Sequence, residues 1–496
     1  MDRMRRRAAE FLVLAIDIGS SSTRSALFDD KARMVNGTDA RREYAVEYSA
    51  DGGAELSPFR LRQAARNCVR ETLQAHRASG FRKVPVIGVS GSAFWHSLLG
   101  LDGNGRPLTP IFTWADSRCA RDAIQLREQF DERKIHAQTG CMLRASFWPA
   151  KLCWFRRTNG NLFRKVVRWV SPADWIFEEI FGTGASSPSM ASGTGLYDLR
   201  TKKWHEDLRQ ACEVGIEKLT VITETPRRAI SFPGLREAQV FTAVGDGAAG
   251  NLGCGANGGG RIAINLGTSA AVRIMEGPRT ARIPIPFGLF RYAVDGERTV
   301  MGGAISNAGN LRRWCARELR LDENEENSLG RKAAAGDRLI VLPFWIAERA
   351  PTWPEKLRGT IVGLTQSTDS AAIFRATTTA VFYRLAEILA LIEKTRGRAT
   401  EIIVSGGAVH SAATLALLAD ALGRDLCVSR DAEASLRGAA RYVLEKLGSQ
   451  SGPGRKPRRV RHDRRLAEKH RVRRARQAAL ESMFSKNGAA FESLSG

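Results

Sequence analysis

Two aspartates in this chain stand beside glycine and hydroxyl residues, a combination that suits phosphate chemistry. The first, Asp17, ends the apolar run 12–16 and is followed by Gly19, by serines at 20–22 and by Arg24. A carboxylate at the end of a buried strand, next to a glycine turn with hydroxyl groups, suits a hydrated Mg²⁺ beside phosphates. Arg24 would add positive charge to a phosphoryl group. Taken alone, the pattern fits a simple hairpin with a capping aspartate equally well.

The second aspartate, Asp246, stands between Gly245 and Gly247. Glycines on both sides let a ligand approach the backbone closely. A lone carboxylate in such a place is a candidate general base for a hydroxyl nucleophile. The alternative is a plain Gly-Asp-Gly turn. Another glycine–hydroxyl segment, 267–269, follows shortly afterwards, and this favours the functional interpretation.

Segments 16–22 and 264–270 resemble each other. In each, a short apolar run turns at glycine, presents hydroxyl residues and continues into a second apolar stretch, which predicts a β-hairpin whose turn offers N–H groups and hydroxyls. The two segments lie about half a chain length apart. We therefore expect two homologous halves, whose hairpins face each other across a cleft and clamp an anion from both sides.

The surrounding sequence alternates between strand and helix patterns. Residues 84–89 and 402–404 read as strands, and residues 57–76 and 411–422 read as helices, which predicts α/β layers. A glycine pair at 406–407 separates the second strand from its helix. Bare backbone at such a helix start can hold the base or ribose of a nucleotide.

Composition limits the class of protein. The chain has 496 residues, 43% of them hydrophobic and 26% charged, which excludes collagen-like, disordered and disulfide-rich classes. Its eight cysteines form no Cys-x-x-Cys pair, which favours reduced thiols over a zinc site. The apolar run 11–16 is too short for a signal peptide or a membrane span. We therefore expect a cytoplasmic protein with more than one domain.

The net charge of +24 requires that nucleic acid be weighed as a partner. Residues 455–476 hold twelve Lys and Arg against two acidic residues, after the linker-like stretch 448–454. No aromatic residues interleave with these charges to stack bases. We interpret the segment as a solvated basic helix, so nucleic acid is an unlikely partner, and weak contact through this tail is the alternative.

In number and order, these motifs resemble those of the FGGY carbohydrate kinases over residues 11–447. Beyond the segments above, the resemblance rests on residues 91–99, 113–118, 151–154, 301–310, 348–353 and 358–364. It implies an α/β protein with the two-domain actin/hexokinase-like (ribonuclease H-like) ATPase fold and a cleft between the domains. The expected parts are an N-terminal sugar-binding domain (11–256), a C-terminal nucleotide-binding domain (257–448) and a basic tail (449–496).

The same resemblance implies ATP-dependent phosphorylation of a sugar-like hydroxyl, with ATP and Mg²⁺ as cofactors. Asp246 matches the family's catalytic base and Asp17 its Mg²⁺–phosphate aspartate. The positions that match nucleotide and phosphate contacts are Ser20, Ser21, Arg24, Gly267, Thr268, Ser269, Gly309, Arg313, Gly407 and Ser411. The positions that match the sugar side are His96, Trp114, Asp116 and Arg118, together with Asp246.

Within the family, residues 95–99, 113–116 and 290–292 look most like those of gluconokinases, which implies conversion of D-gluconate to 6-phospho-D-gluconate. The Met-His-Gly of xylulokinase-like enzymes is absent near His96, and so is the Arg-Glu pair of glycerol kinases at Phe94 and Trp95. These two aromatic residues are bulky for a sugar pocket. The alternatives are another polyol or ketose kinase, such as a xylulokinase, and a non-catalytic sugar or nucleotide sensor. The expected partner is a small-molecule sugar or sugar acid, with no membrane, and a homodimer is an open possibility.

Overall fold

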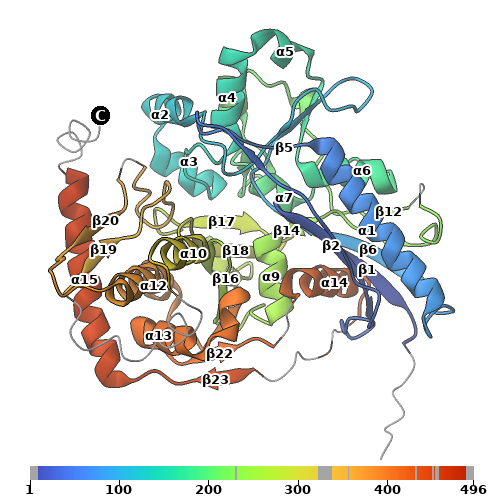
Figure 1. Ribbon diagram of the computed structural model, residues 1–496. Helices are drawn as coiled ribbons and strands as arrows, with labels where there is room; N and C mark the ends of the chain where they lie inside the picture. Colours follow the sequence, from blue (N-terminus) through green and yellow to red (C-terminus); the bar gives the residue numbers. More distant parts are fainter. Residues whose placement is uncertain are drawn as a thin grey trace, which may run out of the picture.

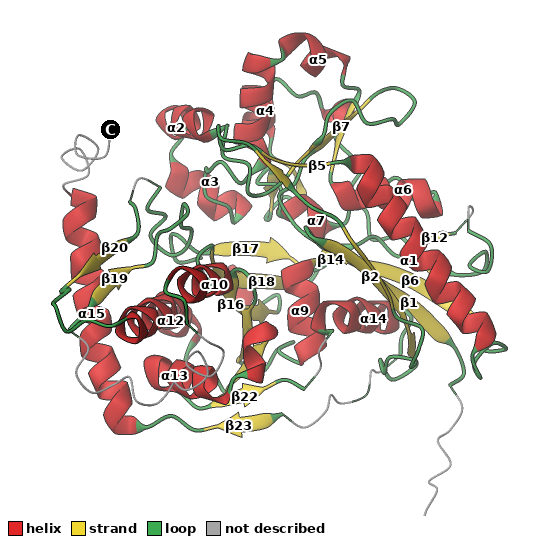
Figure 2. Ribbon diagram, viewed as in Figure 1, coloured by secondary structure: helices red, strands yellow, loops and turns green. Residues whose placement is uncertain are grey.

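The computed structural model describes residues 9–229, 232–321, 338–355, 357–430, 433–449, 452 and 457–486. Its centre consists of two seven-stranded sheets with helices packed around them (Figure 1). Helices surround the strands of both sheets, and loops join the elements (Figure 2). The α/β architecture predicted from the alternating patterns is therefore confirmed.

The first sheet contains the N-terminal hairpin, in the order β12-β13-β6-β1-β2-β3, with β14 also paired to β6. Its strands are β1 (Leu12–Ile18), β2 (Ser22–Asp29), β3 (Ala40–Glu43), β6 (Val86–Ala93), β12 (Arg227–Arg228), β13 (Gln239–Val240) and β14 (Val244–Gly245). Helices α1 (Pro58–Ala78) and α14 (Ala434–Lys446) pack against it from opposite sides (Figure 1). Every residue of β1 is buried as a result, which explains its unbroken apolar run.

The second sheet repeats this arrangement, in the order β17-β18-β16-β15-β21-β22-β23. Its strands are β15 (Arg261–Leu266), β16 (Ala270–Glu276), β17 (Phe290–Ala293), β18 (Thr299–Ile305), β21 (Glu401–Ser405), β22 (Leu426–Val428) and β23 (Arg458–Val460). The helices beside it are α10 (Gly309–Glu318), α12 (Ser370–Arg396) and α13 (Ala412–Leu422). In both sheets the first hairpin strand also pairs in parallel with a later strand, β1 with β6 and β15 with β21. Both predicted hairpins are thus confirmed.

Helix α9 (Asp246–Cys254) lies between the two sheets and begins directly after β14. It crosses α14 at very short range. A Cβ on Gly253 would lie 1.8 Å from the Ala434 carbonyl oxygen, and one on Gly438 would lie 1.7 Å from that of Ala249. Only glycine allows such close contact between helix backbones. Asp246 is therefore placed at the junction of the sheets by a tightly packed helix pair.

A group of helices beyond the first sheet forms its own hydrophobic cluster, which includes the buried rings of Trp148 and Trp169. Its elements are β7 (Leu99–Leu101), α2 (Ala120–Gln129), α3 (Glu132–Thr139), α4 (Trp148–Thr158), α5 (Gly160–Lys165) and β9 (Arg168–Val170). Helices α6 (Pro172–Phe181) and α7 (Pro188–Ser192) connect this group to the first sheet. The loops before α2 and α4 carry several residues of the site described below.

The C-terminal segment is not the separate tail predicted from its charge. Strand β23 pairs antiparallel with β22 and forms an edge of the second sheet. Helix α15 (Arg464–Lys486) packs against α12 and α13, with His470, Gln477 and Glu481 buried. Leu480 and Phe484 of the same helix pack against Leu342, Phe344 and Leu357. The three buried polar residues carry no apolar signal, so the sequence pattern did not predict their burial. Most of the predicted linker, 448–454, lies outside the described residues.

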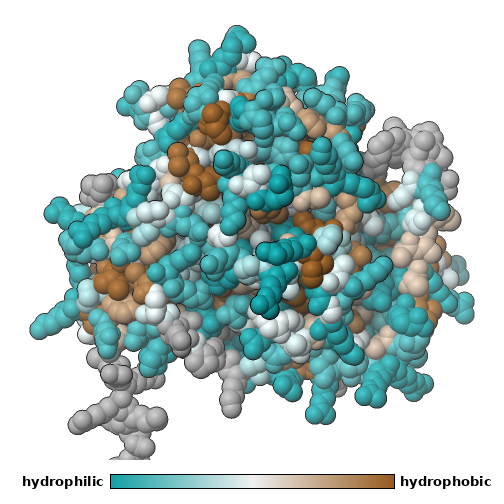
Figure 3. Space-filling model, turned by 180° about the vertical axis from the view of Figure 1, so that it is seen from behind, coloured by the Kyte–Doolittle hydropathy of each residue, from teal (hydrophilic) through white to brown (hydrophobic). Residues whose placement is uncertain are grey.

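Within the described ranges, no helix is both long and apolar enough to cross a membrane. The rear face of the molecule is largely hydrophilic, and its hydrophobic residues gather only in small separate groups (Figure 3). Scattered groups of this kind are normal on a globular protein and indicate no membrane contact by themselves.

Candidate active site

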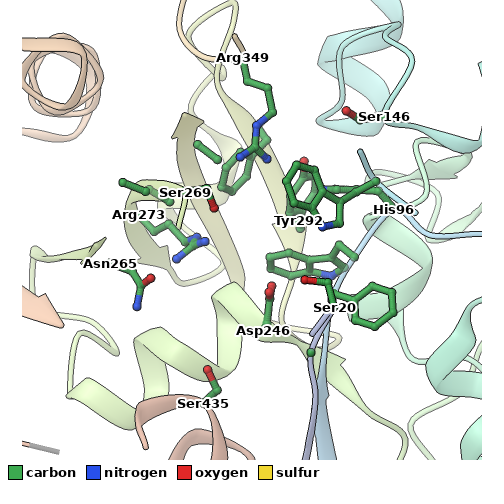
Figure 4. A pocket seen from close by; sticks show the side chains of 18 of the residues that line it. Ser20, His96, Ser146, Asp246, Asn265, Ser269, Arg273, Tyr292, Arg349 and Ser435 are labelled. Atoms are coloured by element: carbon green, nitrogen blue, oxygen red, sulfur yellow. The ribbon is translucent and has the colours of Figure 1, made fainter. Parts of the chain in front are cut away.

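A cavity of about 290 Å³ lies where the two hairpin turns face each other, and we call it the central cavity. The first hairpin contributes Asp17, Gly19, Ser20, Ser21, Ser22 and Arg24, and the second contributes Asn265, Ser269, Ala271 and Arg273. Asp246 lines it from the start of α9 (Figure 4). The structure thus brings together residues from both halves of the chain, as the repeat of the hairpin motif led us to expect.

In both turns the glycine N–H donates a hydrogen bond to the carbonyl of a serine that follows it, three residues on in the first turn and two in the second. The Gly19 N–H donates to the Ser22 carbonyl at 2.9 Å, and the Gly267 N–H donates to the Ser269 carbonyl at 2.9 Å. Ser20 and Ser269 point towards the cavity, one from each turn (Figure 4). Hydroxyls and N–H groups at tight turns are suited to binding phosphate oxygens.

Asp17 is the acidic residue of the first hairpin, and its side chain is 5% exposed. Its Oδ2 accepts a hydrogen bond from Arg24 at 2.5 Å, because the two residues face each other across the hairpin. In the described residues, no cluster of three or more His, Cys, Asp or Glu side chains could hold a metal ion. A Mg²⁺ at Asp17 would therefore take its other ligands from water and phosphate oxygens. Mg²⁺ commonly binds in this way, so the site fits a metal that arrives with a nucleotide.

Asp246 is the first residue of α9, and the N-terminus of a helix stabilises negative charge. Its Oδ1 accepts the Gly247 N–H at 2.7 Å. The Asp246 side chain is exposed to the space inside the cavity, and the protein around the cavity shields the carboxyl from bulk water. This burial raises the pKa of the Asp246 carboxyl above its ordinary value, while the positive charge of Arg273 opposes the shift. A carboxylate with a raised pKa that faces a cavity is the kind of group that accepts a proton in catalysis.

His96 belongs to an aromatic wall on the opposite side of the cavity (Figure 4). Its ring lies 4.9 Å from that of Phe147 and 5.4 Å from that of Tyr292, and its Nδ1 hydrogen-bonds to the Gly193 carbonyl. Burial lowers the pKa of His96 to about 3, so the ring is neutral at physiological pH. Its backbone has φ = 70°, an unusual conformation for histidine that turns the ring into the cavity.

Trp95, which the sequence marks as bulky, lies flat against three glycines. Cβ atoms at Gly193, Gly245 and Gly247 would come within 2.2, 1.7 and 2.7 Å of its indole. The indole N–H donates to the Ser189 carbonyl at 2.9 Å. The ring thus packs behind the Gly-Asp-Gly segment and supports Asp246, while one edge lines the cavity.

Two arginines of the cavity wall were not singled out by sequence reasoning. Arg273 lies on β16, and Arg349 follows Glu348 in a motif to which the sequence alone gives no role. Arg273 could have been predicted from its position four residues after Ser269. Side chains alternate along a strand, so residues an even number apart lie on the same face. Tyr292 on β17 also lines the cavity and was not expected there.

A second pocket, of about 710 Å³, opens in the C-terminal half and lies next to the second hairpin turn; we call it the lateral pocket. Six of the residues expected at a nucleotide line it, namely Gly267, Thr268, Gly309, Arg313, Gly407 and Ser411. Leu266, Val381 and Phe382 add an apolar surface. Gly267 and Thr268 also belong to the turn that leads to Ser269 of the central cavity. A ligand with an apolar ring at one end and phosphates at the other would therefore span both spaces.

Asp116 and Arg118, expected on the sugar side, do not line the central cavity in the structure. Arg118 binds Asp116 through its Nε at 3.1 Å and reaches Glu55 at 2.6 Å. Asp116 also accepts the Ala54 N–H at 3.2 Å. Asp116 is buried and Arg118 is partly exposed, and the two residues form an ion pair with each other. Trp114 of the same segment does line the cavity.

Comparison with known proteins supports the arrangement. The model of the N-terminal domain of the FGGY family of carbohydrate kinases matches residues 12–253, and the C-terminal model matches residues 262–443. The chain is 28% identical to a gluconokinase of Bacillus subtilis over 88% of both chains, and 25% identical to a xylulose kinase of Lactococcus lactis over 84% and 83%. A crystal structure of gluconate kinase from Lactobacillus acidophilus shares the fold, with a TM-score of 0.86 at 22% identity over 97% of this chain and 99% of that one. The two family models together cover most of the sequence, and the chain therefore belongs to the FGGY family of carbohydrate kinases.

Proposed function

We propose that this carbohydrate kinase transfers the γ-phosphoryl group of ATP to the 6-hydroxyl of D-gluconate and releases 6-phospho-D-gluconate and ADP. The observation that carries the proposal is the position of Asp246, whose carboxylate faces the cavity lined by both hairpin turns. The substrate is favoured by the gluconokinases among the relatives of the chain.

In the proposed reaction, ATP occupies the lateral pocket with its phosphates at the two hairpin turns. Ser20, Ser21 and Ser269 bind phosphate oxygens, and Arg24 adds positive charge. When it is bound beside Asp17, Mg²⁺ neutralises charge on the phosphates. Gly309 and Gly407 leave room for the nucleoside.

The sugar acid lies between Asp246 and the aromatic wall of His96 and Trp114. Asp246 accepts the proton of the attacking hydroxyl while the oxygen bonds to the γ-phosphorus and the bond to the β–γ bridging oxygen breaks. Phosphoryl transfer depends mainly on positioning and charge, which the two facing hairpins supply.

A coupled assay of ADP release with Mg-ATP tests the proposal across gluconate, xylulose, ribulose, glycerol and erythritol. We expect kcat/KM for gluconate to exceed the others by at least about tenfold, the scale of a few well-placed polar contacts. A preference for xylulose would instead favour a function like that of the xylulose kinases among the relatives. Binding of ATP without turnover of any substrate would favour the sensor alternative.

The variant Asp246→Asn completes the test. Loss of a general base costs about 10²–10⁴-fold in turnover, whereas ADP binding in the lateral pocket is expected to stay unchanged. Asp207→Asn removes an exposed carboxylate far from the cavity and is the matched control. Turnover within threefold of wild type in Asp246→Asn would remove Asp246 from the role of base.

A further inference from the structure

Arg273 presents a positive charge to the central cavity, where Asp246 supplies an opposing charge but no ion pair joins the two side chains. Its buried Nε has no hydrogen-bond partner in the part of the chain that the structure describes. The guanidinium packs over Gly247, where a Cβ would lie 2.6 Å from this Nε. This position is at the N-terminus of α9, which is itself positive and gives the cation no stabilisation. An arginine held in such a place needs an anion.

Arg349 presents a second guanidinium to the same cavity, and it is fixed in place. Its Nε donates to Ser306 Oγ at 3.1 Å, one terminal nitrogen donates to the Ile305 carbonyl at 3.2 Å, and its plane lies 5.0 Å from the Trp114 ring. The other terminal nitrogen has no hydrogen-bond partner among the residues described. The Glu348 carboxylate, which accepts the backbone N–H groups of Ser306 and Asn307, adds negative charge near Arg349 but forms no direct ion pair with its guanidinium.

Among the residues that the structure describes, neither Arg273 nor Arg349 has a direct ion-pair partner in the wall of the cavity. Asp17 and Arg24 form an ion pair with each other. His96 is neutral, since burial lowers its pKa to about 3. Of the charged groups described in the cavity wall, Asp246 is then the acidic group that faces Arg273 and Arg349, and it forms no ion pair with either. Figure 4 shows both guanidinium groups directed into the space above Asp246. A ligand carboxylate in this space would give both guanidinium groups a direct partner.

We propose that Arg273 and Arg349 together bind the carboxylate of an open-chain sugar acid. This inference rests on the proposed function and names the residues that would select its substrate class. Two guanidinium groups directed at one space provide the donors that a carboxylate accepts best. A ketose or polyol of the same length would leave both cations without a partner in the cavity, so the site discriminates against it.

The competing source of negative charge is the transferred phosphoryl group. The two hairpin turns already provide hydroxyls and N–H groups for phosphate, and Arg349 is anchored at β18 and Trp114 rather than at either turn. For this reason we assign the pair to the carboxylate. An arginine that acts on the phosphoryl group would affect all sugar substrates equally, and the experiment separates the two roles.

The experiment compares D-gluconate with D-glucitol, which has the same chain length but carries a hydroxyl group in place of the carboxylate. Calorimetry without nucleotide measures the Kd of each ligand for wild type, Arg273→Gln and Arg349→Gln. We expect gluconate binding to weaken on the order of 100-fold in each variant, as for loss of one partner of a desolvated charge pair, while glucitol changes less than threefold. Arg60→Gln, which removes an exposed arginine on α1, is the control for net charge.

Unchanged ADP binding in the lateral pocket verifies that each variant is folded. If either does not fold, Arg273→Lys and Arg349→Lys keep the charge, and a tenfold loss confined to gluconate supports the proposal. Equal losses for gluconate and glucitol, or wild-type binding of glucitol as tight as that of gluconate, would overturn it. D-galactonate separates this inference from the choice of substrate. If the enzyme fails to phosphorylate gluconate but binds galactonate through both arginines, the carboxylate site holds and the assignment of gluconate falls.

Discussion

Arg24 holds Asp17 and Glu433 at the same time, with N···O distances of 2.5 Å to each carboxylate. Asp17 ends the first strand of the sequence, and Glu433 precedes α14, more than four hundred residues later. One guanidinium therefore connects the first hairpin to the start of α14, a helix from late in the chain that packs on the first sheet. It also occupies the carboxylate that we propose for Mg²⁺, so metal and arginine compete for Asp17.

This competition predicts a change in the metal requirement. In Arg24→Met, Asp17 loses its cation, and we expect the Mg²⁺ concentration that gives half-maximal turnover to fall about threefold, the scale of a partly exposed ion pair. Turnover at saturation is expected to fall as well, since Arg24 adds charge near the phosphates. A Mg²⁺ titration at fixed ATP measures both effects. Arg62→Met, which breaks an exposed pair with Glu179, serves as the control, and a higher Mg²⁺ requirement in Arg24→Met would contradict the competition.

The pH profile of kcat/KM reports the protonation of Asp246. Because burial raises its pKa, the proton-accepting form is lost at a higher pH than for an exposed aspartate, whose pKa is about 3.9. Activity should therefore fall as pH decreases, through an acid limb above that value. His96 titrates at about pH 3 and does not contribute to the limb. In His96→Asn, which tolerates the positive φ, we expect a higher KM and the same acid limb. Disappearance of the limb in this variant would assign it to His96 instead.

Two of the glycines that line the lateral pocket, Gly309 and Gly407, predict different responses to an added methyl group. A Cβ on Gly309 would lie 2.4 Å from the Gly267 carbonyl oxygen, whereas a Cβ on Gly407 meets nothing within 4 Å. Gly309→Ala should therefore displace the second phosphate turn and weaken ADP binding by about tenfold or more, as expected when a tightly packed site is overfilled. Gly407→Ala should change ADP binding less than twofold, while Gly407→Leu should weaken it by filling the pocket. Calorimetry of ADP measures all three, and equal affinities in both alanine variants would argue against this geometry.

Helix α15 is expected to stabilise the second half of the molecule through a buried ion pair. Arg384 on α12 is fully buried and donates to Glu481 at 2.7 Å. Glu481→Gln would leave this cation with Glu387 alone, and we expect a loss of about 3 kcal/mol in the free energy of unfolding. Glu468→Gln, on the exposed face of the same helix, should change it by less than about 0.5 kcal/mol. Urea unfolding distinguishes the two, and equal stability would show that α15 contributes little.

The sequence predicted local features well and side-chain contacts less well. Both hairpins and the helix near residues 57–76 follow from short-range apolar patterns and turn residues, which act within a few residues of each other. Arg273 and Arg349 were not predicted because they come from distant parts of the sequence. Only the folded chain shows that both line the same cavity. Asp116 and Arg118 illustrate the reverse, since a motif position says nothing about whether two neighbouring charges bind each other or a ligand.

The position of α14 has a consequence for the synthesis of the protein. This helix inserts Leu436, Ala440 and Val443 into the hydrophobic core that β1 and β6 begin. The first sheet is complete after residue 245, yet one of its faces stays uncovered until residues 434–446 leave the ribosome. Almost the whole second half is made during this interval. The nascent N-terminal half therefore carries an exposed apolar surface throughout this interval, and its core is completed only when α14 packs against it.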